Sequence, residues 1–320
     1  MTIVKKDGFE IETKPGKSFY FIGVTTTKSS IMKLFPLWME VLGYSEIKIY
    51  PCDLKIHDEP SNYRRAVAQI KYDDGCYGAL VTTHKMDLYS AAKDMFEYFD
   101  PYALLLDEIS CISKNNGRLE GHAKDPITSG ASYDHFIEKG YYAKTGANVL
   151  IFGAGGSSIA TILHLINKKD KADRPDKIIV INRSQPRLDH LYQILKKVKT
   201  DIKIELICNS DPKQNDKIME SLPNYSLVIN ATGMGKDTPG SPITDDGLFP
   251  ENGWAWEFNY RGELDFMHQA ERQKNSRGLK VEDGWIYFIH GWTQVIFQAL
   301  HIEMTPGIFD KLEKIANSIR

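Results

Sequence analysis

Three closely spaced glycines follow an apolar run near the middle of the chain, in Gly153-Ala-Gly-Gly-Ser-Ser158. This spacing suits the binding of a phosphate group. At a turn from a strand into a helix, Gly153 permits the sharp reversal of the backbone. Gly155 removes a Cβ that would keep a pyrophosphate away from the free amides at the helix N-terminus. Ser158 replaces the third glycine of the G-x-G-x-x-G/A pattern, so the prediction depends on the surrounding elements.

Those elements fit a dinucleotide site. The apolar segments 148–152 and 177–182 predict two strands with a helix between them. A site for NAD places an acidic residue after the second strand, whereas this chain has Asn182-Arg-Ser184 and then Arg187. Guanidinium groups attract a 2′-phosphate that a carboxylate would repel. The sequence therefore favours NADP, although a solvated basic helix start would have the same composition.

Polar residues also follow a predicted strand in the first half of the chain. Strand 78–82 leads into Thr83-His84-Lys85, at the end of a strand where α/β proteins gather their ligands. Further on, the turn signal Lys114-Asn-Asn-Gly117 predicts a hairpin. Its second arm delivers Gly121-His-Ala-Lys-Asp125 into a loop. Both segments are candidates for chemistry.

Strands and helices alternate along the rest of the chain. Periodicity predicts further strands at 18–25, 46–50, 110–113, 118–120, 203–207, 226–230 and 254–258. It predicts helices at 31–42, 63–70, 86–99, 126–139, 161–169, 186–197 and 264–273, with a last one from 305 and a linking segment at 140–146. Alternation of this kind indicates the α/β class, with a largely parallel sheet in the N-terminal half as well.

The composition is that of an ordinary globular protein, with 320 residues, 42% hydrophobic and 26% charged, and a net charge of −2. That length favours two domains, and the charge gives no general attraction to nucleic acid or membranes. Cys52, Cys76, Cys111 and Cys208 have neither zinc-site nor disulfide spacing, so no metal is predicted. No apolar run reaches the roughly 18 residues of a spanning helix. We expect a cytoplasmic protein, monomeric or homodimeric, whose partner is a small-molecule substrate.

With these motifs in order, the chain resembles the shikimate dehydrogenase family over almost its whole length. The glycine turn, the Asn182-Arg-Ser-Gln-Pro-Arg187 segment and Ile229-Asn-Ala-Thr232 are similar to three family motifs. Val81-Thr82 with Lys85 resembles V-T-x-P-x-K with one residue fewer and no proline, and Gly121–Asp125 stands in place of G-x-N-T-D. The resemblance implies an oxidoreductase of aromatic amino acid biosynthesis.

The resemblance also implies roles for individual residues. Lys85 and Asp125 become the catalytic pair at an interdomain cleft, because oxidation of a secondary alcohol needs the hydroxyl proton withdrawn as hydride leaves. Ser29, Thr82 and Tyr260 become substrate contacts. The NADP-binding set becomes Gly153, Ala154, Gly155, Gly156, Ser157, Asn182, Arg183, Ser184, Arg187, Ala231, Thr232, Gly233 and Gly284.

Several substrate positions depart from the family pattern. Ile31 stands at the second serine of an S-x-S pair and Lys28 at a usual histidine, while Ile109 replaces an asparagine. Ala123 and Lys124 replace the asparagine and threonine before the catalytic aspartate, and Gly291 replaces a glutamine. A site that loses several buried donors discriminates poorly for the original polyol or accepts another molecule. Lys28 or Lys124 could replace a lost carboxylate contact, although loop lysines are usually solvated.

We therefore predict an N-terminal α/β substrate domain (1–125), a Rossmann-type NADP-binding domain (126–285) and C-terminal helices (286–320) that pack back on the first domain. The predicted activity is hydride transfer between NADP(H) and a secondary alcohol or ketone of a small alicyclic hydroxy acid. Two alternatives remain open: a noncatalytic NADP-binding regulatory protein, and a true shikimate dehydrogenase with repositioned contacts.

Overall fold

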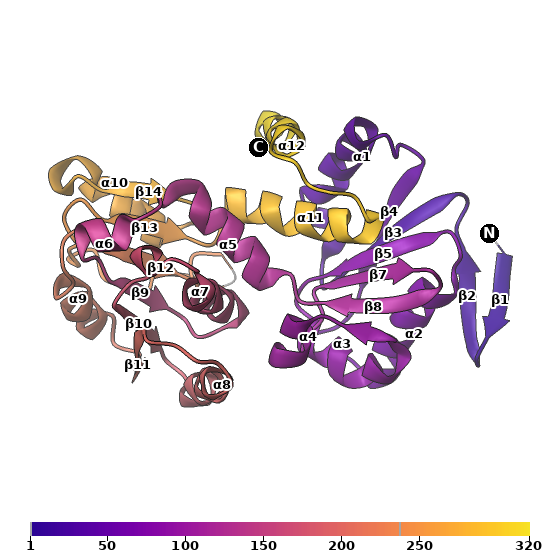
Figure 1. Ribbon diagram of the computed structural model, residues 1–320, viewed down its shortest axis with the longest axis horizontal. Helices are drawn as coiled ribbons and strands as arrows, with labels where there is room; N and C mark the ends of the chain where they lie inside the picture. Colours follow the sequence, from indigo (N-terminus) through magenta and orange to yellow (C-terminus); the bar gives the residue numbers. More distant parts are fainter. Residues whose placement is uncertain (1, 237) are drawn as a thin grey trace. The chain divides into compact units, whose positions relative to one another are not determined.

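The computed structural model describes residues 2–236 and 238–320. The chain divides into two compact units (Figure 1). The first unit combines Met1–Lys124 with Gly291–Arg320, and the second unit is Asp125–His290. The helix α11 (Trp285–Leu300) runs through the second boundary, so the chain enters the first unit twice. None of the described helices combines the length and the apolar character that crossing a membrane requires.

The first unit is built on a mixed six-stranded sheet in the order β4-β3-β5-β7-β8-β6. Its β3 lies parallel to β4 and β5, whereas β7 is antiparallel to β5 and β8. A separate hairpin of β1 (Thr2–Lys6) and β2 (Phe9–Thr13) precedes the sheet, in a segment for which no structure was predicted. The sheet strands are β3 (Lys17–Gly23), β4 (Ile47–Asp53), β5 (Cys76–Val81), β6 (Tyr98–Phe99), β7 (Cys111–Asn115) and β8 (Arg118–His122).

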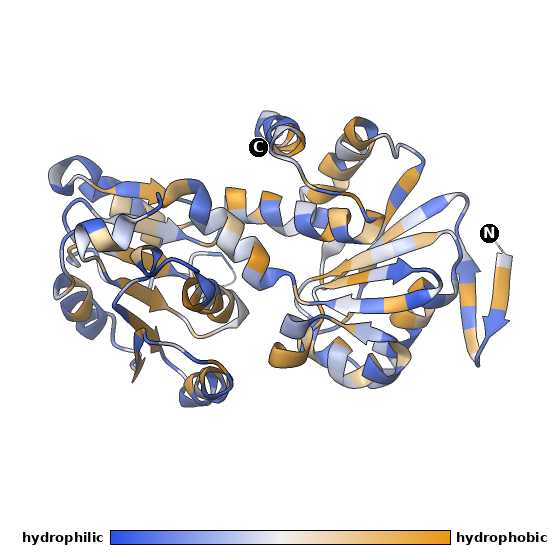
Figure 2. Cartoon of the chain, viewed as in Figure 1, coloured by the Kyte–Doolittle hydropathy of each residue, from blue (hydrophilic) through white to orange (hydrophobic). Residues whose placement is uncertain are grey.

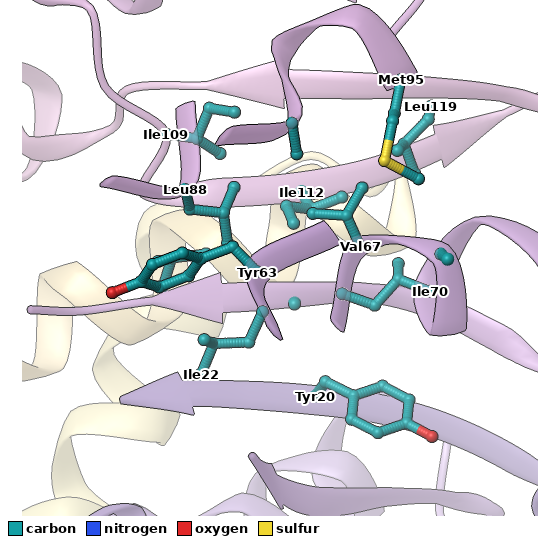
Figure 3. Close-up of a cluster of buried hydrophobic side chains, with 14 of the residues drawn as sticks. Tyr20, Ile22, Tyr63, Val67, Ile70, Leu88, Met95, Ile109, Ile112 and Leu119 are labelled. Carbon is teal, nitrogen blue, oxygen red and sulfur yellow. The ribbon is translucent and has the colours of Figure 1, made fainter. Parts of the chain in front are cut away.

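The helices of the first unit lie mostly where the spacing of apolar residues predicted them. They are α1 (Ile31–Leu42), α2 (Pro60–Tyr72), α3 (Lys85–Ala92), α4 (Pro101–Leu106) and α12 (Pro306–Ser318), with short 3₁₀ turns at Thr26–Lys28 and Lys93–Met95. The predicted helix 86–99 is wrong beyond Ala92, because Tyr98 and Phe99 instead pair with β8. Figure 3 shows the core beneath α2 and α3, where Val67 and Leu88 meet strand residues such as Ile22.

The C-terminal segment packs on the first unit, as predicted. The Trp38 indole of α1 donates a hydrogen bond to the Leu312 carbonyl of α12, with an N–O distance of 2.9 Å. On α11, the ring of Trp292 meets Phe21 of β3 edge-on, with 4.7 Å between ring centroids. Both pairs are buried. The first unit's sheet therefore has a helix from the end of the chain as part of its core.

The second unit is a fully parallel six-stranded sheet in the order β11-β10-β9-β12-β13-β14. Numbered within the unit this is 3-2-1-4-5-6, the order of dinucleotide-binding sheets. Its central strands are fully buried and appear hydrophobic in Figure 2. The strands are β9 (Val149–Phe152), β10 (Lys177–Asn182), β11 (Lys203–Cys208), β12 (Leu227–Asn230), β13 (Trp254–Glu257) and β14 (Lys280–Glu282).

The helices of the second unit differ from the expected set in two places. The segment predicted as a simple link contains a one-turn helix, and the helix α9 was not predicted. The helices are α5 (Asp125–Phe136), α6 (Tyr141–Thr145), α7 (Gly156–Asn167), α8 (Gln185–Lys196), α9 (Pro212–Glu220) and α10 (Asp265–Arg277), with a 3₁₀ turn at Lys171–Asp173. The Asp211 side chain caps α9 by accepting from the Lys213 amide, which is why a polar segment becomes helical there.

Candidate functional site

The glycine turn lies where the strand order of the second unit reverses, between β9 and β12. Gly153 follows β9 with φ +101°, a conformation that side chains rarely adopt. A Cβ at Gly153 would lie 2.6 Å from the Ala231 carbonyl oxygen at the end of β12. The two strand ends therefore approach one another closely at the switch point where parallel sheets bind ligands.

The start of α7 leaves space above its amides. Gly155 is the N-cap of α7, and a Cβ there would meet no atom of the described residues within 4 Å. A phosphate can approach this backbone without a side chain in the way. The buried Ser158 hydroxyl donates to the Gly153 carbonyl at 2.7 Å, so the residue that replaces the third glycine stabilises the turn. Ala154, Gly156 and Ser157 complete the same turn.

The end of β10 shapes the segment that carries the two arginines. The Asn182 side chain accepts from the Ala154 amide at 3.2 Å and donates to the Ser184 carbonyl at 2.9 Å, which ties this segment to the glycine turn. Arg183 and Arg187 are both exposed, and within the described part of the chain neither guanidinium has an ion-pair partner. Two guanidinium groups of this kind, on a segment bonded to the glycine turn, have the charge that a 2′-phosphate would require.

The end of β12 is held by a buried polar network. Asn230 accepts from the Thr232 amide at 3.2 Å and from its hydroxyl at 2.7 Å. The Asn230 amide group donates to the fully buried Glu257 carboxylate at 2.6 Å. Asn259 donates to the other oxygen of Glu257 from its backbone at 2.8 Å and from its side chain at 2.6 Å. This network fixes the start of the Ala231–Gly233 segment.

Burial gives Glu257 unusual electrostatics. Desolvation raises the pKa of the carboxyl to about 7, against the opposing hydrogen bonds from Asn259 and Asn230 and with a smaller raising contribution from Asp283. Gly284 has a steric role here, because a Cβ at that position would lie 2.0 Å from the Phe258 carbonyl oxygen. The close backbone approach requires glycine whether or not a cofactor touches it.

The predicted residues of the first unit gather at the carboxyl ends of β3 and β5. Thr82 follows β5 and donates its amide to the Ile22 carbonyl of β3 at 3.0 Å. Ser29 ends the 3₁₀ turn in the loop after β3, and Lys85 begins α3. In the second unit, Asp125 begins α5, and the Tyr260 ring packs on Trp285 and Phe288.

Three positions at which apolar residues were predicted to replace family polar residues are core positions of the first unit. Ile31 and Ile109 are both fully buried, and Ile109 belongs to the cluster drawn in Figure 3. Ala123 is also fully buried. These positions supply packing to the first unit and no hydrogen-bonding side chain.

Sequence reasoning missed several polar contacts. Glu257 is the last residue of the strand β13, which is otherwise apolar. A carboxylate at the end of an apolar run was the sequence signal for a buried polar contact. Tyr63 was treated as a helical residue, yet its hydroxyl lies 3.2 Å from the His84 Nδ1 and 3.4 Å from the Asp87 carboxylate. Lys124 was treated as a loop lysine, but it is buried and bonded to Gln298. Long-range partners of this kind leave no local pattern.

Comparison with known proteins gives a consistent result. No family model matches the chain. A curated shikimate dehydrogenase (NADP(+)) of Symbiobacterium thermophilum is 28% identical over 234 residues, which is 72% of each chain. Among solved structures, shikimate dehydrogenase of Aquifex aeolicus gives a TM-score of 0.70 at 17% identity and covers 93% of this chain and 97% of its own. Quinate dehydrogenase of Corynebacterium glutamicum, in complex with NAD, gives 0.71 at 17% identity, with 95% and 99% covered.

The fold and the glycine turn define an α/β protein with a Rossmann-type unit. Within that class, the chain resembles the shikimate dehydrogenases in sequence and shares the fold of solved members of the family. The predicted family resemblance and the predicted two-domain fold class are both confirmed.

Proposed function

We propose that the protein is an NADP-dependent dehydrogenase or reductase that acts on the secondary alcohol or ketone of a small alicyclic hydroxy acid. The observation that carries the proposal is the glycine turn at the switch point, with Arg183 and Arg187 exposed on the neighbouring segment. The name of the curated relative specifies NADP(+), in agreement with this cofactor. Bound NADP supplies a hydride acceptor, and its reduced form a hydride donor.

The other chemistry is a proton transfer, which we assign to Lys85. A lysine on the reacting hydroxyl removes its proton during oxidation and returns it during reduction. Asp125 is proposed as the partner that holds the lysine, as the family resemblance implies. A protein that only binds NADP has no need of this pair, so both residues favour an enzyme over a noncatalytic regulator.

The proposed substrate differs from shikimate in its polar contacts. Ile31 and Ile109 are buried in the core and Gly291 has no side chain, so three positions that are polar in the family offer no hydrogen bond here. A pocket built in this way rejects a polyol that needs those donors. We therefore propose a less hydroxylated cyclic acid as the substrate.

Two measurements test the proposed function. Titration of the purified protein with NADP and NAD should show tighter binding of NADP, and equal affinities would contradict the cofactor assignment. A panel of cyclic hydroxy acids and keto acids, assayed by NADPH absorbance, should yield a better substrate than shikimate. Shikimate turnover at a kcat/KM of about 10⁴ M⁻¹s⁻¹ or more would contradict the altered specificity. Tight NADP binding without turnover of any panel member would favour the regulator.

A further inference from the structure

Lys124 is a buried cation with a neutral partner. Lys124 is 9% exposed, and its ammonium donates to the side-chain amide oxygen of Gln298 on α11 at 2.5 Å. No carboxylate lies within ion-pair distance of this ammonium in the part of the chain that the structure describes. An ammonium has three donors, and one amide oxygen satisfies one of them. Burying an ammonium group that lacks a counter-ion costs free energy, and binding of an anion would offset this cost.

The neighbouring groups do not supply that anion. Burial raises the pKa of the Cys111 thiol to about 12, against the opposing field of Lys124, so the thiol stays neutral at physiological pH. The Asp100 carboxylate is already engaged: it accepts from the amides of Ala103 at 2.7 Å and Ala123 at 3.2 Å, and lies 3.6 Å from the His122 ring. The charge of Lys124 is therefore available to a ligand.

The backbone around Lys124 is held in place before any ligand arrives. The Lys124 amide donates to the Ser110 hydroxyl at 2.7 Å, and the Ser110 amide donates to the His122 carbonyl at 2.9 Å. The His122 ring lies 2.9 Å from the Ser113 hydroxyl. Ordering this segment costs little further entropy on binding, which favours recognition of a ligand.

The same backbone segment connects Lys124 with Lys85. The Ile109 amide donates to the Lys85 carbonyl at 3.1 Å, and the next residue, Ser110, binds the Lys124 amide. Both lysines are therefore attached to adjacent residues of the first unit. The backbones of the two lysines therefore lie in the same part of the first unit.

We propose that Lys124 binds a carboxylate of the substrate, with Gln298 orienting the ammonium. This inference rests on the proposed function, since it names the anionic group of the molecule on which Lys85 acts. One lysine with a neutral amide suits a monoanion, whereas phosphate sites usually gather several cationic or backbone donors. Within the proposed substrate class, Lys124 therefore places the carboxylate on the first unit.

The test compares a charged probe with its neutral analogue. Binding of 3-hydroxycyclohexanecarboxylate and of the matching carboxamide is measured by calorimetry, with NADP present. Wild type should bind the carboxylate at least about ten-fold more tightly, since charge-assisted bonds are worth about 1.5–3 kcal/mol. Lys124→Gln should lose that preference while its carboxamide affinity stays unchanged. The exposed Lys48→Gln removes the same charge elsewhere in the first unit and should behave as wild type.

A second variant tests the proposal even if Lys124→Gln does not fold. Gln298→Glu places a carboxylate beside the Lys124 ammonium, so it should weaken binding of the carboxylate probe about ten-fold without lowering the melting temperature. A wild type that binds the two probes equally, or binds neither, would overturn the proposal. Tighter, Lys124-dependent binding of a phosphorylated analogue would overturn the carboxylate assignment.

The two proposals fail in different ways. If the protein transfers no hydride with any hydroxy acid, the enzyme assignment fails while the Lys124-dependent carboxylate preference persists. If hydride transfer occurs and Lys124→Gln retains the full preference, only the carboxylate site fails. Titration of the same samples with NADP shows whether the second unit is folded. It therefore distinguishes misfolding of that unit from the two failures above.

Discussion

The second unit presents its candidate ligand groups mainly through backbone, whereas the first unit presents them through side chains. At Gly153 and Gly155 the spacing of the main chain decides what can bind, and the parallel sheet fixes that spacing. In the first unit, Lys85 begins the helix α3 and Lys124 follows the strand β8 of a mixed sheet. A single substitution changes a side-chain contact without disturbing the fold. Under the proposed function, this difference allows the substrate region to change while the dinucleotide-binding strand order is kept.

The largest expected effect is on the side-chain chemistry. Lys85→Ala and Asp125→Asn should each lower turnover by about 10²–10⁴-fold, because each removes part of the proton transfer. Affinity for NADP should stay nearly unchanged. The double variant should lose little more than the worse single variant, since residues that act as a unit are not additive. Exposed Lys33→Ala on α1 is the control, and near-normal turnover of Lys85→Ala would remove the catalytic assignment.

Glu257 and Asp100 should give the two units opposite responses to pH. The pKa of Glu257 is raised from 4.5 to about 7 by burial, so the folded state holds a proton that the unfolded chain has released. Stability should therefore fall as pH rises between these values, by up to about 3 kcal/mol, and then stay level. Glu257→Gln should abolish this fall in urea denaturation between pH 5 and 8.

Asp100 provides the contrasting case. Burial alone would raise the pKa of its carboxyl, but hydrogen bonds from His122 and from the Ala103 and Ala123 amides outweigh burial and hold the pKa below 3.8. Its stabilising contribution is present above that value and is lost as pH falls through the lowered pKa. Asp100→Asn should leave the slope between pH 5 and 8 unchanged, and a slope equal to that of Glu257→Gln would contradict the comparison.

Two glycine substitutions separate folding from cofactor binding within one turn. Gly153→Ala should destabilise the protein by about 1–3 kcal/mol, because an alanine there has φ +101° and contacts the Ala231 carbonyl. Gly155→Ala meets open space, so its denaturation curve without ligand should match wild type. Its added methyl group should still weaken NADP binding. Equal stability of the two variants would show that the turn is less constrained than its geometry indicates.

The smallest expected effect is on cofactor choice. Arg183→Ala should weaken NADP binding about ten-fold and leave NAD binding nearly unchanged, because it removes one charge-assisted contact with the 2′-phosphate. Fluorescence titration of both cofactors measures the difference. Lys199→Ala, an exposed basic residue after α8, should have no effect on either. Parallel losses for NAD and NADP would place Arg183 at another part of the cofactor.

The features predictable from sequence were those with a local signature. The strand at Lys177–Asn182 and the helix at Ile31–Leu42 have the predicted bounds, because their apolar periodicity lies in adjacent residues. The residue after this helix, Gly43, is its C-cap in a left-handed conformation that suits glycine. The strand at Tyr98–Phe99 was taken as helix, since two aromatic residues after a helical segment give no sign that β8 will pair with them.

The features of the candidate site also differ in whether a local sequence pattern predicts them. The glycine turn was recognisable because its geometry depends on consecutive residues, whereas the bond between Lys124 and Gln298 joins positions far apart in the chain. A single sequence contains no local pattern for such a pair. The catalytic role of Lys85 and Asp125 likewise remains a prediction from family resemblance.

The discontinuity of the first unit has a consequence for biosynthesis. Residues 291–320 supply Trp292 against Phe21 and the Leu312 carbonyl for Trp38, and they leave the ribosome after residues 1–290. The second unit is contiguous, so it can fold as soon as His290 has emerged, whereas the N-terminal segment must wait with part of its core uncovered. A nascent chain arrested when His290 has left the exit tunnel but residues 291–320 have not should therefore hold a protease-resistant second unit and a first unit that recruits chaperones.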